Sequence, residues 1–169
     1  MAGAKGGRAA RYAAEFEAAQ ERLIRRLESL TDEQWRRPGR NYPQQLNQED
    51  ERRTVGVIAH HVAIAAPRLL ERIQALAEGR PLPPFAPEAV SRDNARHAAD
   101  HADVTREEVL RLLREQRPRI AAALRAIPDH CLDRSGPTPA GPLTVAERIE
   151  RVLIGHIDAH LGSIEAALS

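Results

Sequence analysis

The sequence predicts an all-α protein, a four-helix bundle with long connections. Four segments carry apolar residues at spacings of three and four, which is the period of an amphipathic helix. Threonine capping residues precede three of these segments, and no segment of any length shows the strict alternation that is typical of a strand. Helices of about 20 to 25 residues would each span about 30–37 Å, and such similar lengths favour a bundle.

The first predicted helix follows a Gly-rich N-terminus, residues 1–9, which we expect to be flexible. Trp35 is expected to close one end of the core, in the turn that begins at Thr31. A polar connection that contains prolines then runs to residue 53. The apolar stripe of the first predicted helix comprises Tyr12, Phe16, Ala19, Leu23, Leu27 and Leu30.

Thr54 caps the second predicted helix, and Gly79 with the prolines that follow ends it. Pro67 lies inside this helix, and because a proline nitrogen carries no hydrogen, we expect a kink there. The connection over residues 79–104 has room for one short extra helix that starts near Pro87. Two long connections allow topologies other than simple up-down-up-down. The stripe of this second helix comprises Ile58, His61, Ala65, Leu69, Ile73 and Leu76.

Capping boxes begin the third and fourth predicted helices, Thr105 with Glu108 and Thr144 with Glu147. Residues 128–142 between these helices are crowded with proline and glycine and are predicted to be a loop. Because the four predicted helices belong to one bundle, residues 10–169 are predicted to form a single domain. The third stripe comprises Val109, Leu112, Leu113, Ile120, Leu124 and Ile127, with a bend expected at Pro118. The fourth comprises Val145, Ile149, Val152, Leu153, His156, His160, Ile164 and Leu168.

Two histidines occupy positions of the fourth helix where leucine would be expected. His156 and His160 are four residues apart, so their rings lie one above the other on the inward face, in a geometry that can chelate one cation. Replacing two core leucines sacrifices apolar burial of about 1.5–3 kcal/mol each. Each buried ring also needs a hydrogen-bond partner. A divalent metal ion would offset both costs.

The third ligand is predicted on the second helix, where the neighbours of His61 three and four residues away are apolar. Those of His60 are hardly more polar, so periodicity alone does not choose cleanly, and the stripe through residues 58, 65, 69 and 73 favours His61. His60 is expected to lie beside the metal site as a supporting or cleft residue. Three neutral imidazoles suit Zn, Ni, Co, Cu or Fe and leave positions open for water or substrate, as catalytic sites do. The alternative is a set of core histidines that are hydrogen-bonded to carbonyls or water.

His97 and His101 repeat the spacing of four, but Asp, Arg and Asn surround them. We expect them to be surface residues, with a role at the mouth of the site as the alternative. His130 and Cys131 are adjacent in the predicted loop. Adjacency does not supply the geometry of a catalytic dyad, so both are expected to be ordinary loop residues.

The composition excludes several classes of protein. A formal net charge of +1 provides no electrostatic signature for nucleic acid or an anionic membrane, so we expect neither as a partner. The single cysteine excludes an intramolecular disulfide and a Cys-based zinc finger. No apolar run is long enough to span a membrane, and the N-terminus lacks the apolar region of a signal peptide, so we expect a soluble, cytoplasmic protein. Glu-x-x-His, P-loop and Gly-x-Ser-x-Gly motifs are absent, which excludes ferritin-like di-iron, nucleotide and α/β-hydrolase sites.

Three stretches of the chain resemble the DinB-like (DinB/YfiT) superfamily of bacterial four-helix proteins. Residues 16–35, which end in LESLTDEQW, resemble the first helix and its closing turn. RTVGVIAHHVA, residues 53–63, resembles the second-helix signature, in which a histidine follows seven residues after Ser or Thr; that register selects His61. LTVAERIERVLIGHIDAHLGSI, residues 143–164, resembles the last-helix signature with its His-x-x-x-His.

The resemblance implies a bundle with a divalent metal ion on His61, His156 and His160, often in a homodimer. Some relatives are transferases or isomerases that use a low-molecular-weight thiol, such as mycothiol or bacillithiol. The leading hypothesis is therefore a metal-dependent transferase in which a thiolate attacks an electrophilic small molecule. The alternatives are a metal-dependent hydrolase and a non-enzymatic, stress-related binding or structural bundle. The candidates for holding a substrate carboxylate are Arg52, Arg53, Arg92 and Arg96.

Overall fold

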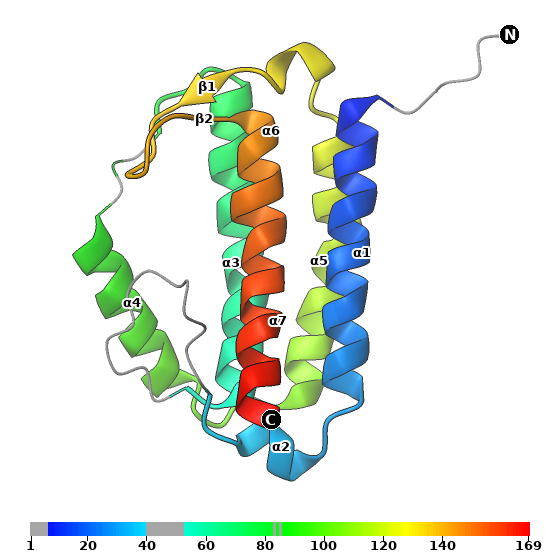
Figure 1. Cartoon of the computed structure of the whole chain (residues 1–169), viewed down its shortest axis with the longest axis vertical. Helices are drawn as coiled ribbons and strands as arrows, with labels where there is room; N and C mark the ends of the chain where they lie inside the picture. The colour runs from blue at the N-terminus through cyan, green and yellow to red at the C-terminus, as the bar shows by residue number, and fades with distance from the viewer. Residues whose placement is uncertain (1–6, 40–52, 83, 85) are drawn as a thin grey trace, which may run out of the picture.

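Four long helices form the bundle that the sequence predicts (Figure 1). The structure, a computed structural model, describes residues 7–39, 53–82, 84 and 86–169. The bundle comprises α1 (Arg8–Glu28), α3 (Val55–Ala77), α5 (Arg106–Arg125) and a C-terminal helix built from α6 (Val145–Glu147), η2 (Arg148–Ile154) and α7 (Gly155–Leu168). Helix α1 packs against α5, and α3 packs against both α5 and α7.

The order of the helices in space departs from simple up-down-up-down. Figure 1 shows α1 and the C-terminal helix running in one direction, while α3 and α5 both run in the other. Two consecutive long helices can be parallel only if the chain between them returns along the bundle. Helix α4 (Pro87–Asp100) makes that return outside the bundle, on the side of α3 (Figure 1). At 14 residues it is longer than the short helix expected near Pro87.

A short helix, α2 (Asp32–Arg36), closes one end of the bundle (Figure 1). Thr31 begins it with a capping box, in which its side chain and that of Gln34 each accept a backbone hydrogen bond from the other residue. Trp35 is buried against the core, and its indole Nε1 donates to the Val104 carbonyl at 2.9 Å. The predicted role of Trp35 at the end of the core is confirmed.

The proline-rich connection before the C-terminal helix closes the other end. It contains η1 (Asp129–Cys131) and two strands of two residues, β1 (Ser135–Gly136) and β2 (Leu143–Thr144), which pair antiparallel. The sequence predicted a loop without strands; the pairing arises because the chain reverses at Gly141, whose φ is +114°. The Asp129 carboxylate accepts from the backbone N–H groups of Arg8 and Ala9. This long-range cap starts α1 at Arg8, inside the segment expected to be flexible. Residues 1–6 of that segment lie outside the described residues.

The core at the centre of the bundle contains most of the predicted apolar stripes, but on α3 the buried face passes through Ala59, Val62 and Ala66, while the predicted Ala65 and Leu69 are only half-buried. Helices α3 and α5 run through Pro67 and Pro118 without ending. No helix in the described part of the chain is both long and apolar enough to cross a membrane. Fully buried large side chains come from all four long helices: Phe16, Leu23, Leu27, Ile73, Leu113, Leu124, Ile149, Leu153, Ile157 and Ile164.

The capping box at Thr144 provides a test of what starts the C-terminal helix. Its hydroxyl accepts from the Glu147 backbone N–H at 3.1 Å, and the Glu147 carboxylate accepts from the Thr144 N–H at 2.9 Å. We expect Thr144→Ala to lower the free energy of unfolding by about 1 kcal/mol, because the Glu147 backbone N–H loses its acceptor and the Glu147 carboxylate loses the hydroxyl as a donor. Urea denaturation measures this, and Thr144→Ser, which keeps the hydroxyl, should change little. Equal stability of Thr144→Ala and the wild type would contradict the prediction.

Candidate metal centre

The C-terminal helix contains a π-helical segment immediately before the predicted metal ligands. Over η2 the helix is wound more loosely, and the Gly155 N–H donates to the carbonyl of Glu150, five residues earlier. Such a segment inserts one residue into the helical period, and π-bulges are frequent at functional sites. The predicted stripe of the fourth helix has an uninterrupted period and gives no indication of this π-helical segment. Leu153 and Ile157 on either side of Gly155 are both completely buried, while His156 lies against His61 of α3.

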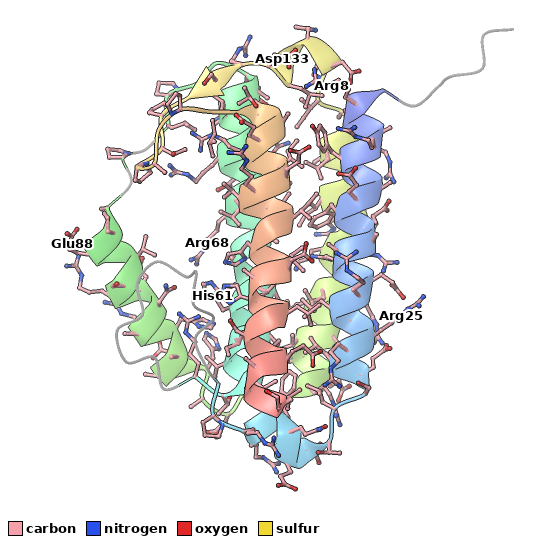
Figure 2. All side chains as sticks on the ribbon, in the orientation of Figure 1. Arg8, Arg25, His61, Arg68, Glu88 and Asp133 are labelled. Carbon is pink, nitrogen blue, oxygen red and sulfur yellow. The ribbon has the colours of Figure 1, made fainter. Side chains whose placement is uncertain are left out.

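The three predicted ligands meet between α3 and α7. His156 Nε2 lies 3.2 Å from His61 Nε2 and 3.1 Å from His160 Nε2. His160 is buried, while His61 and His156 are half-buried. Figure 2 labels His61 on α3. We call His61, His156 and His160 the α3–α7 triad; one ring nitrogen from each lies within 4.8 Å of the others.

The spacing of these nitrogens suits a metal ion better than a network of hydrogen bonds. One ring nitrogen carries either one proton or one lone pair, so His156 Nε2 cannot form a well-directed hydrogen bond with both neighbouring rings. Ligand nitrogens about 2.0–2.1 Å from a tetrahedral ion lie about 3.3 Å apart, close to the two distances observed. His61 rather than its neighbour His60 joins the α3–α7 triad, although His60 is the more buried of the two. The donor set can therefore hold a divalent ion.

The structure also brings together three histidines that the sequence analysis left apart. His60, His97 and His101 form a second group, the α3–α4 triad, in which the ring nitrogens again lie within 4.8 Å of one another. The expectation that His97 is a surface residue is wrong, because α4 folds back onto α3 and leaves that side chain only 9% exposed. The His-x-x-x-His spacing and the doubled His60-His61 were the signals available in the sequence.

A protein-family comparison identifies the family to which this bundle belongs. The family model of the DinB superfamily matches residues 9–164, almost the whole chain. The chain belongs to the DinB superfamily. No curated protein sequence matches it.

The fold of this DinB superfamily member is similar to that of a solved bacterial structure. YfiT from Bacillus subtilis aligns with a TM-score of 0.65 and 21% sequence identity, over 93% of this chain and 83% of that chain. YfiT is described as a probable metal-dependent hydrolase with an unusual four-helix bundle topology. At this identity the likeness establishes the fold.

Burial keeps the α3–α7 triad neutral in this DinB superfamily member. Removal from water, together with the nearby positive charge of Arg53, lowers the pKa of His156 to about 4. Burial likewise lowers the pKa of His160 to about 2 and that of His61 strongly, with the neighbouring imidazoles as the next cause. Neutral imidazole is the form that binds metal, so the triad is ready for a cation at neutral pH.

Of the four arginines proposed to line the site, Arg53 is the one whose charge reaches both triads. It is 5% exposed and lowers the pKa of His97 as well as those of the α3–α7 triad. Arg92 and Arg96 lie on the exposed face of α4, and Arg52 lies outside the described residues. His130 is exposed and Cys131 is buried on η1, and neither belongs to a triad.

The lowered pKa values predict that acid destabilises the metal-free protein. Because the folded pKa of His156 lies below the ordinary value near 6.5, the unfolded chain takes up protons first as the pH falls, and folding is disfavoured. The contribution of neutral His156 to the free energy of unfolding is fully present above about pH 6.5 and is lost as the pH falls towards 4. For His156 alone, the loss at pH 5 is about 2 kcal/mol. The metal-free chain should still fold at neutral pH, because a chain of this length has a sufficient core.

Urea denaturation of the chelator-treated protein at pH 7.5, 6 and 5 measures this loss. His156→Gln removes one of the titrating groups and should give a shallower dependence on pH. His130→Gln removes an exposed histidine and serves as the matched control, with the dependence expected to be that of the wild type. Equal stability of the wild type at pH 7.5 and pH 5 would contradict the prediction.

Proposed function

We propose that this DinB superfamily member is a divalent-metal-dependent enzyme whose ion is held by His61, His156 and His160. The observation that carries the proposal is the approach of His156 Nε2 to the Nε2 atoms of both other rings, at 3.1 and 3.2 Å. Three imidazoles leave coordination positions open, which is typical of catalytic rather than structural sites. When bound, the ion would lower the pKa of a water or thiol in an open position.

The surroundings of the triad favour an anionic reactant. Arg53 is buried, and its positive charge acts on all three rings of the triad. A guanidinium in such a position stabilises an anionic nucleophile or a substrate carboxylate, and the stabilisation is larger in a site that excludes water. Arg53→Gln should therefore reduce turnover while leaving the three imidazoles in place.

Transfer of a low-molecular-weight thiol to an electrophilic small molecule is the first candidate reaction. The thiol sulfur forms a bond to the electrophilic carbon, the leaving group departs with its electron pair, and the thiol proton goes to the leaving group or to solvent. Hydrolysis is the second candidate, and the description of YfiT as a probable metal-dependent hydrolase supports it. In hydrolysis water replaces the thiol, and the protein groups keep the same positions.

Turnover by protein purified without a nickel column tests the proposal. The metal-free chain is loaded with Zn, Ni or Co and offered a chromogenic aryl chloride with a small thiol, or a chromogenic ester with water alone. We expect metal-dependent turnover that chelation and His156→Ala abolish, and the dependence on thiol separates the two reactions. A chain that takes up none of the three ions would contradict the proposal. Uptake of metal without turnover above that of His156→Ala would favour the non-enzymatic alternative.

The homodimer that the family resemblance implies is a further part of the proposal. Sedimentation equilibrium of the metal-loaded protein distinguishes the 18.7 kDa chain from a species of twice that mass. A concentration-independent mass of one chain would contradict it without affecting the metal site.

A further inference from the structure

A second group of histidines lies beside the α3–α7 triad. His60 Nδ1 is 2.8 Å from His97 Nε2, and the rings of these two residues are stacked. The ring centroid of His101 lies 4.2 Å from that of His60 and 4.9 Å from that of His97. From these contacts we propose that His60, His97 and His101 form a second site for a first-row divalent ion such as Zn, Co or Ni. This site goes beyond the proposed function, which uses none of these three residues.

The way α4 packs is the first argument for the second site. His97 is the one buried residue among those described in α4, so a histidine rather than an apolar stripe holds this helix against the bundle. The residue that it meets, His60, is 3% exposed. Two imidazoles in such a position lose hydration and contribute less apolar burial than leucine, which is a costly way to attach a helix. A shared metal ion supplies the missing attraction.

The spacing of the ligand atoms is the second argument. His97 and His101 are four residues apart, so they can chelate from one helix, and His60 supplies a ligand from another. Ligand nitrogens around a tetrahedral ion lie about 3.3 Å apart, so the His60–His97 pair would open by about half an ångström to admit one. The alternative at 2.8 Å is a single N–H···N hydrogen bond between these two rings.

The electrostatics of the α3–α4 triad are mixed. Arg53 and Arg68 place positive charge near His97, which opposes a cation. Figure 2 shows Arg68 further along α3 from His61, on the same side of the helix. Glu108 acts on His60 with the opposite sign and favours a cation. We therefore expect this site to bind its ion more weakly than the α3–α7 triad.

The two triads are close neighbours. Their members His60 and His61 are consecutive on α3, and the ring centroids of His61 and His97 are 5.8 Å apart. Because metal bound at one triad would hide the loss of metal from the other, an experiment on either triad must measure the number of ions bound per chain. Two double variants are matched, because each removes two imidazoles at a spacing of four from one helix: His97→Ala with His101→Ala, and His156→Ala with His160→Ala.

Titration of the metal-free full chain with Co²⁺, followed by equilibrium dialysis and elemental analysis, counts the ions. We expect two per chain in the wild type, one in each double variant and none when the four substitutions are combined. His130→Ala, which changes a histidine of neither triad, should keep two. Saturation of the wild type at one ion, with no change in the His97→Ala, His101→Ala variant, would overturn the second site and leave the proposed function standing. Saturation of the wild type at one ion that is lost only in the His97→Ala, His101→Ala variant would overturn the proposed function alone.

Hydrogen exchange provides a second readout that does not depend on the folding of the α4 variant. In the His156→Ala, His160→Ala protein, Co²⁺ should slow amide exchange over residues 87–100, because an ion on the α3–α4 triad fixes α4 to α3. An unchanged exchange rate over α4 at saturating Co²⁺ would contradict the proposal. The unchanged rate is the result expected if only a hydrogen bond between His60 and His97 attaches α4 to α3.

Discussion

Replacing His156 by alanine is expected to remove the metal ion from the α3–α7 triad. His156 is the central member, since its Nε2 is the atom that lies near those of both His61 and His160. Binding of about 10–16 kcal/mol through four protein ligands corresponds to about 3 kcal/mol per ligand. Loss of one ligand should therefore weaken binding by roughly two orders of magnitude, at about 1.4 kcal/mol for each factor of ten.

The measurement is best made in the His97→Ala, His101→Ala background, where the metal count reports the α3–α7 triad alone. Competition with a chromophoric chelator gives the affinity, and circular dichroism confirms that the helices remain. His160→Ala and His61→Ala should have similar effects. His60→Ala is the matched control, because it changes the adjacent residue of α3 and should leave the affinity of this triad within a few-fold of its starting value. Loss of metal on His60→Ala, with retention on His61→Ala, would show that the assignment of residues on α3 is reversed.

Replacing Trp35 by alanine is expected to cause the largest loss of stability. The indole is 7% exposed, fills the end of the core and donates to the Val104 carbonyl. Truncation of a buried aromatic residue costs about 3–5 kcal/mol. Because a domain has about 5–15 kcal/mol in total, this is a large fraction of its stability. Denaturation by guanidinium measures the loss, and Trp35→Phe, which keeps most of the ring, should lose less.

Gly56 tests the same contact from the other side. A Cβ atom on Gly56 would lie 2.5 Å from Trp35 Nε1 and 2.6 Å from its Cε2, so the indole would have to move. In an ordinary helix, glycine to alanine stabilises by about 1 kcal/mol. Here the crowding of a packed ring, at about 1–3 kcal/mol, should outweigh that gain. A Gly56→Ala protein more stable than the wild type would show that the indole packs loosely on α3.

Apolar periodicity predicted that His156 and His160 face inward from the fourth helix, but it did not choose cleanly between His60 and His61. His61, His156 and His160 stand at predicted stripe positions of long helices, although His61 and His156 are only half-buried and His60 is more buried than His61. Burial of these rings follows from local structure, because helical periodicity sets the face on which each residue lies. The ring nitrogens of the three histidines lie close together because α3 packs against α7. The family resemblance implied this packing, and the structure shows it.

The α3–α4 triad could not be predicted in the same way. Asp93, Arg92 and Arg96 made the segment look solvated, and the outer face of α4 is indeed exposed. The inward-facing His97 meets His60 only because the chain from α3 to α5 returns along the bundle. A contact between residues 37 positions apart depends on the path of that connection, and no local period encodes such a path.

The sequence by itself determined the helices, their caps and the inward-facing histidines, because hydrophobic period and capping chemistry act within a few residues. Tertiary structure alone decided three further features: the parallel course of α3 and α5, the π-helical turn before His156, and the second triad on α4. Each of these depends on how elements far apart in the chain pack together. Packing between helices therefore decided which imidazoles lie together.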